Sequence, residues 1–132
     1  MKALRLIIIL TLLVSCTKKS DDPIIVTSLD QIAGIWKWES TCGGLINTCG
    51  YSSRSHYGQI EFATDNQFIE SYNDTVYFAA QYEIKKSDDH YGTLVLRKMG
   101  SDVVLSDRPI SILDNKLMIT GGELLFTYKK TK

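Results

Sequence analysis

From residue 34 to the end of the chain, apolar and polar residues alternate in short runs separated by clusters of Gly, Asn, Asp and Ser. In the first run, Trp36 and Trp38 fall on one side of an extended chain, and Lys37 and Glu39 fall on the other. A period of two predicts β-strands with one buried face, and the intervening clusters predict turns. The strands expected from this pattern are 34–40, 58–63, 68–72, 75–85, 93–99, 110–113, 116–120 and 123–128.

Most connections between the predicted strands are short turns. Asp114-Asn115 and Gly121-Gly122 are turn-forming pairs, and such tight turns join antiparallel neighbours. No stretch between the strands has the sustained helical period of a crossover connection. We therefore expect an all-β domain, a small eight-stranded antiparallel meander barrel, because closing the sheet removes its exposed edges. A sandwich of two sheets is the alternative.

The longest predicted strand, 75–85, has a consistently apolar face. We expect this face to lie in the core of the barrel, because residues two apart in a strand point the same way. Its members are Val76, Phe78, Ala80, Tyr82 and Ile84.

A single helical turn is expected just before the first strand. Ser28 is a good N-cap residue, and Gln31 stands three positions later, where a capping box places its second member. The turn would end near Ile32 and lead directly into the strand that begins at Gly34.

The N-terminal segment has the layout of an export signal. Two basic residues, Lys2 and Arg5, precede an apolar run that is too short to span a bilayer as a helix. The sequence Leu13-Val14-Ser15-Cys16 resembles the lipobox of bacterial lipoproteins, which implies that Cys16 becomes the lipid-bearing first residue. An ordinary secretory signal with an unmodified Cys16 is one alternative, and a buried helix is another. We expect a signal peptide at 1–15, the lipidated cysteine and a linker at 16–27, and the barrel domain at 28–132.

A lipid on Cys16 would attach the protein to the cell envelope, most simply the outer membrane. The linker begins with the charged run from Lys18 to Asp22, which resembles the short acidic signals that send some lipoproteins to the cell surface. Periplasmic and surface orientations both remain open. The expected partners are the membrane, through the N-terminal lipid, and an envelope protein or a small ligand.

The two remaining cysteines, Cys42 and Cys49, are close in sequence. In an exported protein such a pair predicts a disulfide, here closing a short Gly-rich loop. A metal site with His56 as a third ligand is an alternative, although a spacing of six residues between cysteines is unusual for zinc. Free thiols are the third possibility.

The helical turn and first strand carry a recognisable pattern, Leu29-x-x-Ile32-x-Gly34-x-Trp36. It resembles the entry of lipocalin-like, calycin-type barrels, and is closest to the short lipocalin-like lipoprotein domains of bacteria. The resemblance implies that Trp36 plugs the closed end of the barrel and packs against the N-terminal turn. It also implies that the other end is open.

Aromatic residues are the best candidates for a binding site, since the chain has seven Tyr, four Phe and two Trp. We expect a small apolar or amphipathic ligand at the open end, with Trp38, Tyr51, Tyr57 and Phe78 as the lining. The alternative is a non-enzymatic protein-interaction or inhibitor module that uses the disulfide-pinned loop 42–57 as its contact surface.

Other function classes find little support. Lys and Arg together equal Asp and Glu in number, so there is no basic excess to recruit nucleic acid. His56 follows Ser52, Ser53 and Ser55 without a nucleophile-elbow pattern, and His90 follows two aspartates in a predicted turn. We expect no catalytic set, no metal site and no cofactor.

Overall fold

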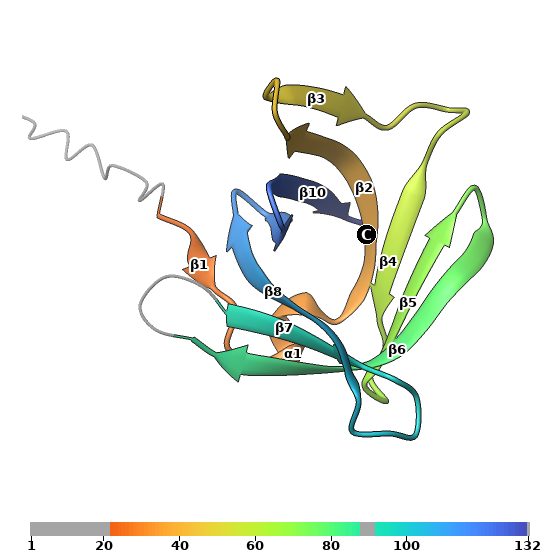
Figure 1. Cartoon of the computed structure of the whole chain (residues 1–132), viewed down its shortest axis with the longest axis vertical. Helices are drawn as coiled ribbons and strands as arrows, with labels where there is room; N and C mark the ends of the chain where they lie inside the picture. The colour runs from red at the N-terminus through yellow and green to blue at the C-terminus, as the bar shows by residue number, and fades with distance from the viewer. Residues whose placement is uncertain (1–21, 88–91, 132) are drawn as a thin grey trace, which may run out of the picture.

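The computed structural model describes residues 22–87 and 92–131, which form a closed antiparallel β-barrel (Figure 1). Each barrel strand pairs with the next one along the chain, and the last strand pairs with the first. The barrel strands are β2 (Gly34–Gly43), β4 (Gly58–Phe62), β5 (Gln67–Tyr72), β6 (Thr75–Lys86), β7 (Gly92–Arg97), β8 (Val104–Leu113), β9 (Lys116–Gly121) and β10 (Leu124–Lys130). The predicted all-β meander barrel of eight strands is confirmed, and the sandwich alternative is wrong.

Two short strands lie outside the barrel path. β1 (Ile24–Ile25) pairs with the end of β8, and β3 (Thr48–Tyr51) pairs with the end of β2. The region 42–57 was expected to be a loop throughout. It begins instead with a β2–β3 hairpin. All four residues of β3 are exposed, so the strand has no alternation of buried and exposed positions that the sequence could reveal.

Strand β8 begins at Val104, six residues before the predicted start at residue 110. Its first half contains Ser106, Arg108 and Pro109, and lacks the apolar alternation on which the prediction depended. Ser106 and Arg108 lie on the same face of the strand as the buried Ile110. Polar residues occupy an inward face here because this part of the strand lies where the barrel opens.

Two hairpin turns form at the pairs that the sequence predicts, whereas the turn expected at Gly121-Gly122 lies one residue later, at Gly122-Glu123. Asp114 and Asn115 have φ angles of 51° and 60°, and Asn73 and Asp74 have φ angles of 46° and 64°. Two consecutive positive φ angles give the tight turns whose twist matches paired antiparallel strands, and Asn and Asp adopt this conformation more readily than other non-glycine residues.

One end of the barrel is closed by Trp36, which is only 2% exposed. Its indole N–H donates a hydrogen bond of 2.7 Å to the carbonyl oxygen of Ile32, the last residue of the helical turn α1 (Leu29–Ile32). The turn is held in place by Gln31, whose side-chain oxygen accepts a hydrogen bond of 3.0 Å from the Ser28 N–H. The Lys130 ammonium lies 5.3 Å from the centre of the Trp36 ring, a cation–π contact. Trp36 therefore satisfies its one polar group while filling the closed end.

The folded domain begins before residue 28. Ile24 pairs with Ile112 of β8, and Val26 is fully buried in the core. Gly92 permits this approach, because a Cβ atom there would lie 2.1 Å from the Val26 carbonyl oxygen. Residues 24–26 of the expected linker 16–27 thus belong to the folded domain.

The expected signal peptide 1–15, Cys16 and the charged run to residue 21 lie outside the described residues. Within the described ranges, no helix has the length and apolar character to cross a membrane.

Three register shifts place an extra residue in a barrel strand. In the pairing of β5 with β6, Glu70 lies opposite Phe78 and Ser71 lies opposite Val76, so Tyr77 is the extra residue. Equivalent shifts leave Glu39 extra in β2 and Leu105 extra in β8. A bulge changes which side chains face inward beyond that point. Val76, expected in the core, is accordingly 60% exposed.

We predict that Trp36→Ala lowers the free energy of unfolding by about 3–5 kcal/mol, because it empties a large buried site and frees the Ile32 carbonyl. Trp36→Phe retains most of the apolar volume and should cost about 1–3 kcal/mol. Urea unfolding measures both, with Val76→Thr at an exposed strand position as the control. A Trp36→Ala protein within 1 kcal/mol of the wild type would contradict the role of Trp36 as the plug.

Candidate functional site

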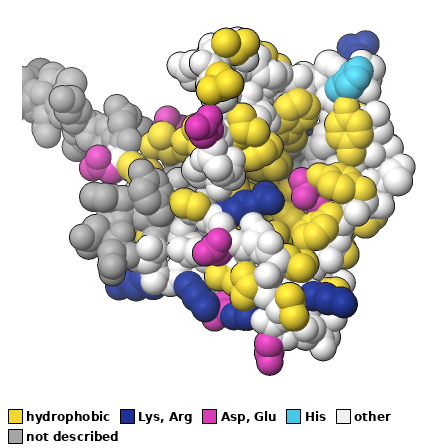
Figure 2. Space-filling view, viewed as in Figure 1, with side chains coloured by type: hydrophobic (Ala, Val, Ile, Leu, Met, Phe, Trp, Pro, Cys, Tyr) yellow, Lys and Arg dark blue, Asp and Glu magenta, His cyan; other side chains and the backbone are white. Residues whose placement is uncertain are grey.

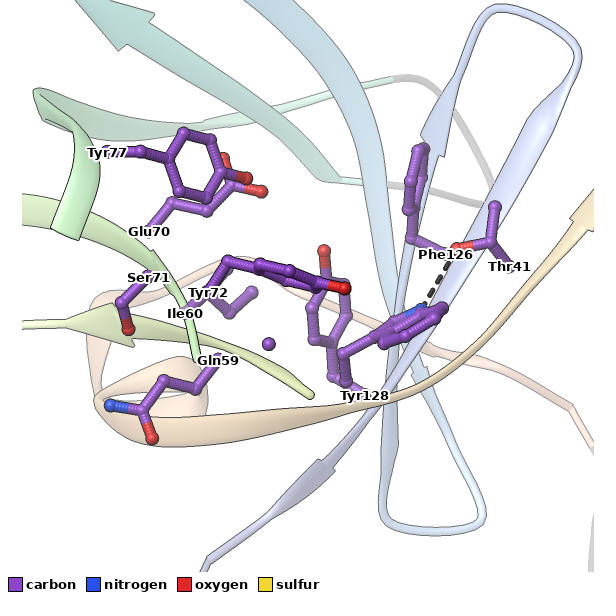
Figure 3. Close-up of a pocket in the computed structure, with 11 residues that line it drawn as sticks. Thr41, Gln59, Ile60, Glu70, Ser71, Tyr72, Tyr77, Phe126 and Tyr128 are labelled. Atoms are coloured by element: carbon purple, nitrogen blue, oxygen red, sulfur yellow. Dashed lines mark hydrogen bonds between the residues drawn. The ribbon is translucent and has the colours of Figure 1, made fainter. Parts of the chain in front are cut away.

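A cavity of about 190 Å³ opens at the end of the barrel away from α1. Hydrophobic side chains gather around the hollow at the centre of this face, with charged side chains among them (Figure 2). Eleven of the described residues, from five strands, line the cavity, and five of them are aromatic (Figure 3). They are Trp38, Thr41, Gly58, Gln59, Ile60, Glu70, Ser71, Tyr72, Tyr77, Phe126 and Tyr128.

The bulge at Glu39 shapes one wall of the cavity. Trp38 and Thr41 are three positions apart and would point to opposite faces of a regular strand, yet both line the cavity. The Trp38 indole N–H donates a hydrogen bond of 2.9 Å to the Thr41 hydroxyl (Figure 3). Their partners on β10, Tyr128 and Phe126, complete this wall. The bulge therefore aligns four lining residues on two paired strands.

The bulge in β6 shapes the opposite wall. Regular alternation would place Tyr77 on the outer face, since Phe78 faces the core. As the extra residue of the bulge, Tyr77 instead reaches the cavity and lies beside Glu70 (Figure 3). The pKa of the Tyr77 phenol is raised, first by partial burial and then by its hydrogen-bonding interaction with the Glu70 carboxylate and the charge of that group.

Glu70 is the one charged residue among the described residues that line the cavity. It also acts on Tyr128, whose pKa is raised by burial and then by the Glu70 charge, against an opposing effect of Arg108. Arg108 is not part of the lining, and its Nε atom donates a hydrogen bond of 2.9 Å to the Ser106 hydroxyl. Both phenols therefore stay neutral donors well above neutral pH.

A network of polar contacts holds the rim beside the cavity. The Tyr57 hydroxyl donates a short hydrogen bond to the Asp74 carboxylate, which is the main reason that the pKa of Tyr57 is raised. The Tyr57 N–H donates to the Asn73 side-chain oxygen at 3.1 Å, and the Asn73 amide donates to the Ser55 carbonyl at 3.2 Å. The segment that follows β3 is thus fastened to the β5–β6 turn.

The predicted disulfide is confirmed, since Cys42 and Cys49 are bonded to each other. They occupy directly paired positions of β2 and β3, with their Cα atoms 4.1 Å apart. The metal and free-thiol alternatives for these cysteines are therefore wrong. The bond fixes the β2–β3 hairpin, whose tip carries the exposed residues Leu45 and Ile46.

The four residues expected to bind a ligand lie in different places. Trp38 lines the cavity, whereas Phe78 lies deeper and packs edge-on against Phe68, with ring centres 6.1 Å apart. Tyr51 is exposed on β3, and Tyr57 lies at the rim outside the lining. The structure thus brings one of the four to the cavity.

The remaining aromatic and acidic lining residues were not singled out by the sequence pattern. Tyr72, Phe126 and Tyr128 lie on predicted strands. The alternation of those strands could have indicated that these side chains point inward. Glu70 follows the buried Phe68 by two positions on β5, so regular alternation also gave a signal for it. Tyr77 depends on the bulge in β6, and the sequence carries no clear mark of that bulge.

The serine and histidine residues near position 56 lie in an exposed segment outside the cavity lining. The Ser55 hydroxyl is 3.0 Å from His56 Nδ1 and 3.2 Å from the Ser53 hydroxyl. His56 also contacts the edge of the Tyr72 ring, with ring centres 6.4 Å apart. Within residues 22–87 and 92–131, no three His, Cys, Asp or Glu side chains gather as metal ligands would. His90 lies outside the described residues.

No family model matches the sequence, and neither the curated proteins nor the solved structures include a significant match. The cavity and its surroundings are therefore the basis for a functional proposal.

The raised pKa values of Tyr57, Tyr77, Tyr82 and Tyr128 predict a loss of stability in alkali. The folded protein favours the neutral phenols, so stability is retained below the ordinary tyrosine pKa of about 10 and falls as the pH rises above it. Urea unfolding at pH 8 and pH 11 measures the loss. Tyr128→Phe should make the loss smaller, whereas Tyr51→Phe at an exposed position should not. An equal loss in both variants would contradict the prediction.

Proposed function

We propose that the protein is a lipid-anchored envelope protein whose barrel binds a small apolar or amphipathic molecule at its open end. The observation that carries the proposal is the cavity of about 190 Å³ lined by five aromatic side chains. Concave, largely apolar sites with a few polar groups are typical of small-molecule binding. Lys130, Trp36 and α1 close the other end, so a ligand would enter only from the mouth.

The size of the cavity limits what it can enclose. Pockets for drug-sized ligands have volumes of roughly 300–1,000 Å³. The cavity here is smaller, so it suits a compact molecule or the end of a longer one. The rest of a longer ligand would extend past Tyr72 and Tyr77 toward solvent.

The barrel layout supports a relationship with lipocalin-like lipoproteins. A helical turn, a Gly-x-Trp strand and a meander that closes on itself occur in the expected order. The hydrogen bond from Trp36 to Ile32 gives the plug the geometry that the resemblance implied. We extend this relationship to the ligand-binding mode as part of the proposal.

The β2–β3 hairpin supports the second candidate function, a protein-interaction module. Leu45 and Ile46 at its tip are 99% and 79% exposed, and the Cys42–Cys49 disulfide holds them on a fixed support. Exposed apolar side chains on a rigid loop suit contact with a protein partner in the envelope.

The lipid anchor is tested at Cys16. We predict that the protein extracted from membranes begins at residue 16 and carries the added mass of a diacylglyceryl group. Cys16→Ser should abolish this mass and release the protein from the membrane fraction. Intact-mass spectrometry of both proteins measures the difference. A wild-type protein that begins elsewhere, with an unmodified Cys16, would overturn this part of the proposal.

The ligand site is tested by filling it. A Cβ atom at Gly58 would meet the Ser71 carbonyl oxygen, Trp38 Cβ and Tyr72 Cδ2 at ordinary distances of 3.5–3.8 Å, so a side chain fits there. We predict that native mass spectrometry of the envelope-extracted protein shows a retained mass of a few hundred daltons, and that Gly58→Leu lowers its occupancy at least ~10-fold.

The matched control is Gly50→Leu, because a Cβ atom at Gly50 on β3 meets nothing within 4 Å. Retention of the ligand by Gly58→Leu would contradict the assignment of the cavity. A wild-type protein without bound ligand would favour the protein-interaction function instead.

A further inference from the structure

The cavity has an acidic character that the expectation of an apolar ligand does not explain. Among the described residues, Glu70 is its one charged lining residue, and no described Lys, Arg or His side chain contributes to the lining. The ion pairs among the described residues are Arg97–Glu83 and Lys116–Glu39, and neither involves Glu70. The Glu70 carboxylate thus faces the cavity without a cationic partner from the described part of the chain.

Aromatic rings surround the space beside this carboxylate. Glu70 and Tyr72 come from β5 and Tyr77 from β6, whereas Phe126 and Tyr128 come from β10 (Figure 3). The face of an aromatic ring is electron-rich and attracts cations, most strongly where water is excluded. Several rings with one carboxylate form the arrangement that recognises organic ammonium groups.

The charges near the cavity favour a cation over an anion. The positive charge of Arg108 opposes the effect of Glu70 on the pKa values of Tyr77 and Tyr128. Its guanidinium is directed to the Ser106 hydroxyl and does not line the cavity. Among the described residues, Glu70 is therefore the charged group that lines the cavity.

We propose that the cavity binds an organic ammonium group, seated among the aromatic rings with Glu70 as its counter-ion. This inference rests on the proposed function and specifies the chemistry of its ligand. A volume of about 190 Å³ suits a methylated ammonium head more closely than a large hydrophobic body. The apolar walls favour a weakly hydrated quaternary ammonium over a strongly hydrated primary amine.

The test uses the full chain, purified in dodecyl maltoside, and three ligands of the same shape. Choline is the cation, 3,3-dimethylbutan-1-ol is its neutral carbon analogue, and 3,3-dimethylbutanoate is a related anion. Isothermal titration calorimetry measures the three dissociation constants. We expect choline to bind roughly 10-fold more tightly than the neutral analogue, in line with cation–π contacts to partly exposed rings and a counter-ion.

Two isosteric variants separate the role of Glu70 from a general effect of charge. Glu70→Gln should weaken choline binding roughly 10-fold and leave the neutral analogue unchanged. Glu61→Gln is the matched control on the neighbouring strand β4, because Glu61 lies between the buried residues Ile60 and Phe62 and faces outward. It should leave both affinities unchanged.

A lipid headgroup and a free cation share this chemistry, and short-chain phosphatidylcholine below its micellar concentration distinguishes them. Tighter binding than choline would identify the headgroup as the ligand source, and weaker binding would identify the free cation. Both results support the ammonium site.

Three outcomes would overturn the inference. Equal binding of choline and the neutral analogue, unaffected by Glu70→Gln, would leave an apolar ligand site without an ammonium preference. Tightest binding of the anion, abolished by Arg108→Gln, would reverse the charge of the ligand. Binding of none of these compounds by a protein that still carries its own cargo in native mass spectrometry would exclude the ammonium group and retain the proposed function.

Discussion

The pairing of β2 with β10 is the constraint on which the rest of the structure depends. It joins the first and last barrel strands, so every other strand must tilt and curve to meet this closure. β2 also pairs with β4 near its start and with β3 near its end, so one strand organises three neighbours. Trp36 lies on this strand where β4 and β10 flank it, and its burial therefore depends on closure.

The two ends of β2 differ in their pairing and in what they enclose. Near Trp36, regular pairing on both sides gives a filled interior and a plug tied to α1. Beyond Lys37, the pairing with β4 stops, and the bulge at Glu39 turns Thr41 inward. A bulge bends its strand and increases the local twist, and the bulges in β2 and β6 both lie beside the cavity. The same strand thus produces the stable end and the hollow end of the barrel.

Local patterns in the sequence predicted most of the fold. Alternation around Trp36 and Trp38, the Asp114-Asn115 turn and the cysteine pair each have a short-range physical signature, and each occurs as expected. The site was much less predictable, because it depends on where strands meet out of register. Tyr77 and Phe78 differ by one position, and only the bulge decides which one reaches the cavity. The first half of β8 was missed for a related reason, since inward polar residues near an opening do not alternate with apolar ones.

The close packing of Val26 against Gly92 has a mechanical consequence. Ile24 and Ile25 pair with β8, and Val26 is fully buried in the core. Three successive residues therefore fix the chain where it enters the barrel. If the protein is tethered through its N-terminal end, a pull on the tether loads the hydrogen bonds between β1 and β8 directly. The load would then be carried by the pairs Ile24–Ile112 and Ile25–Ser111.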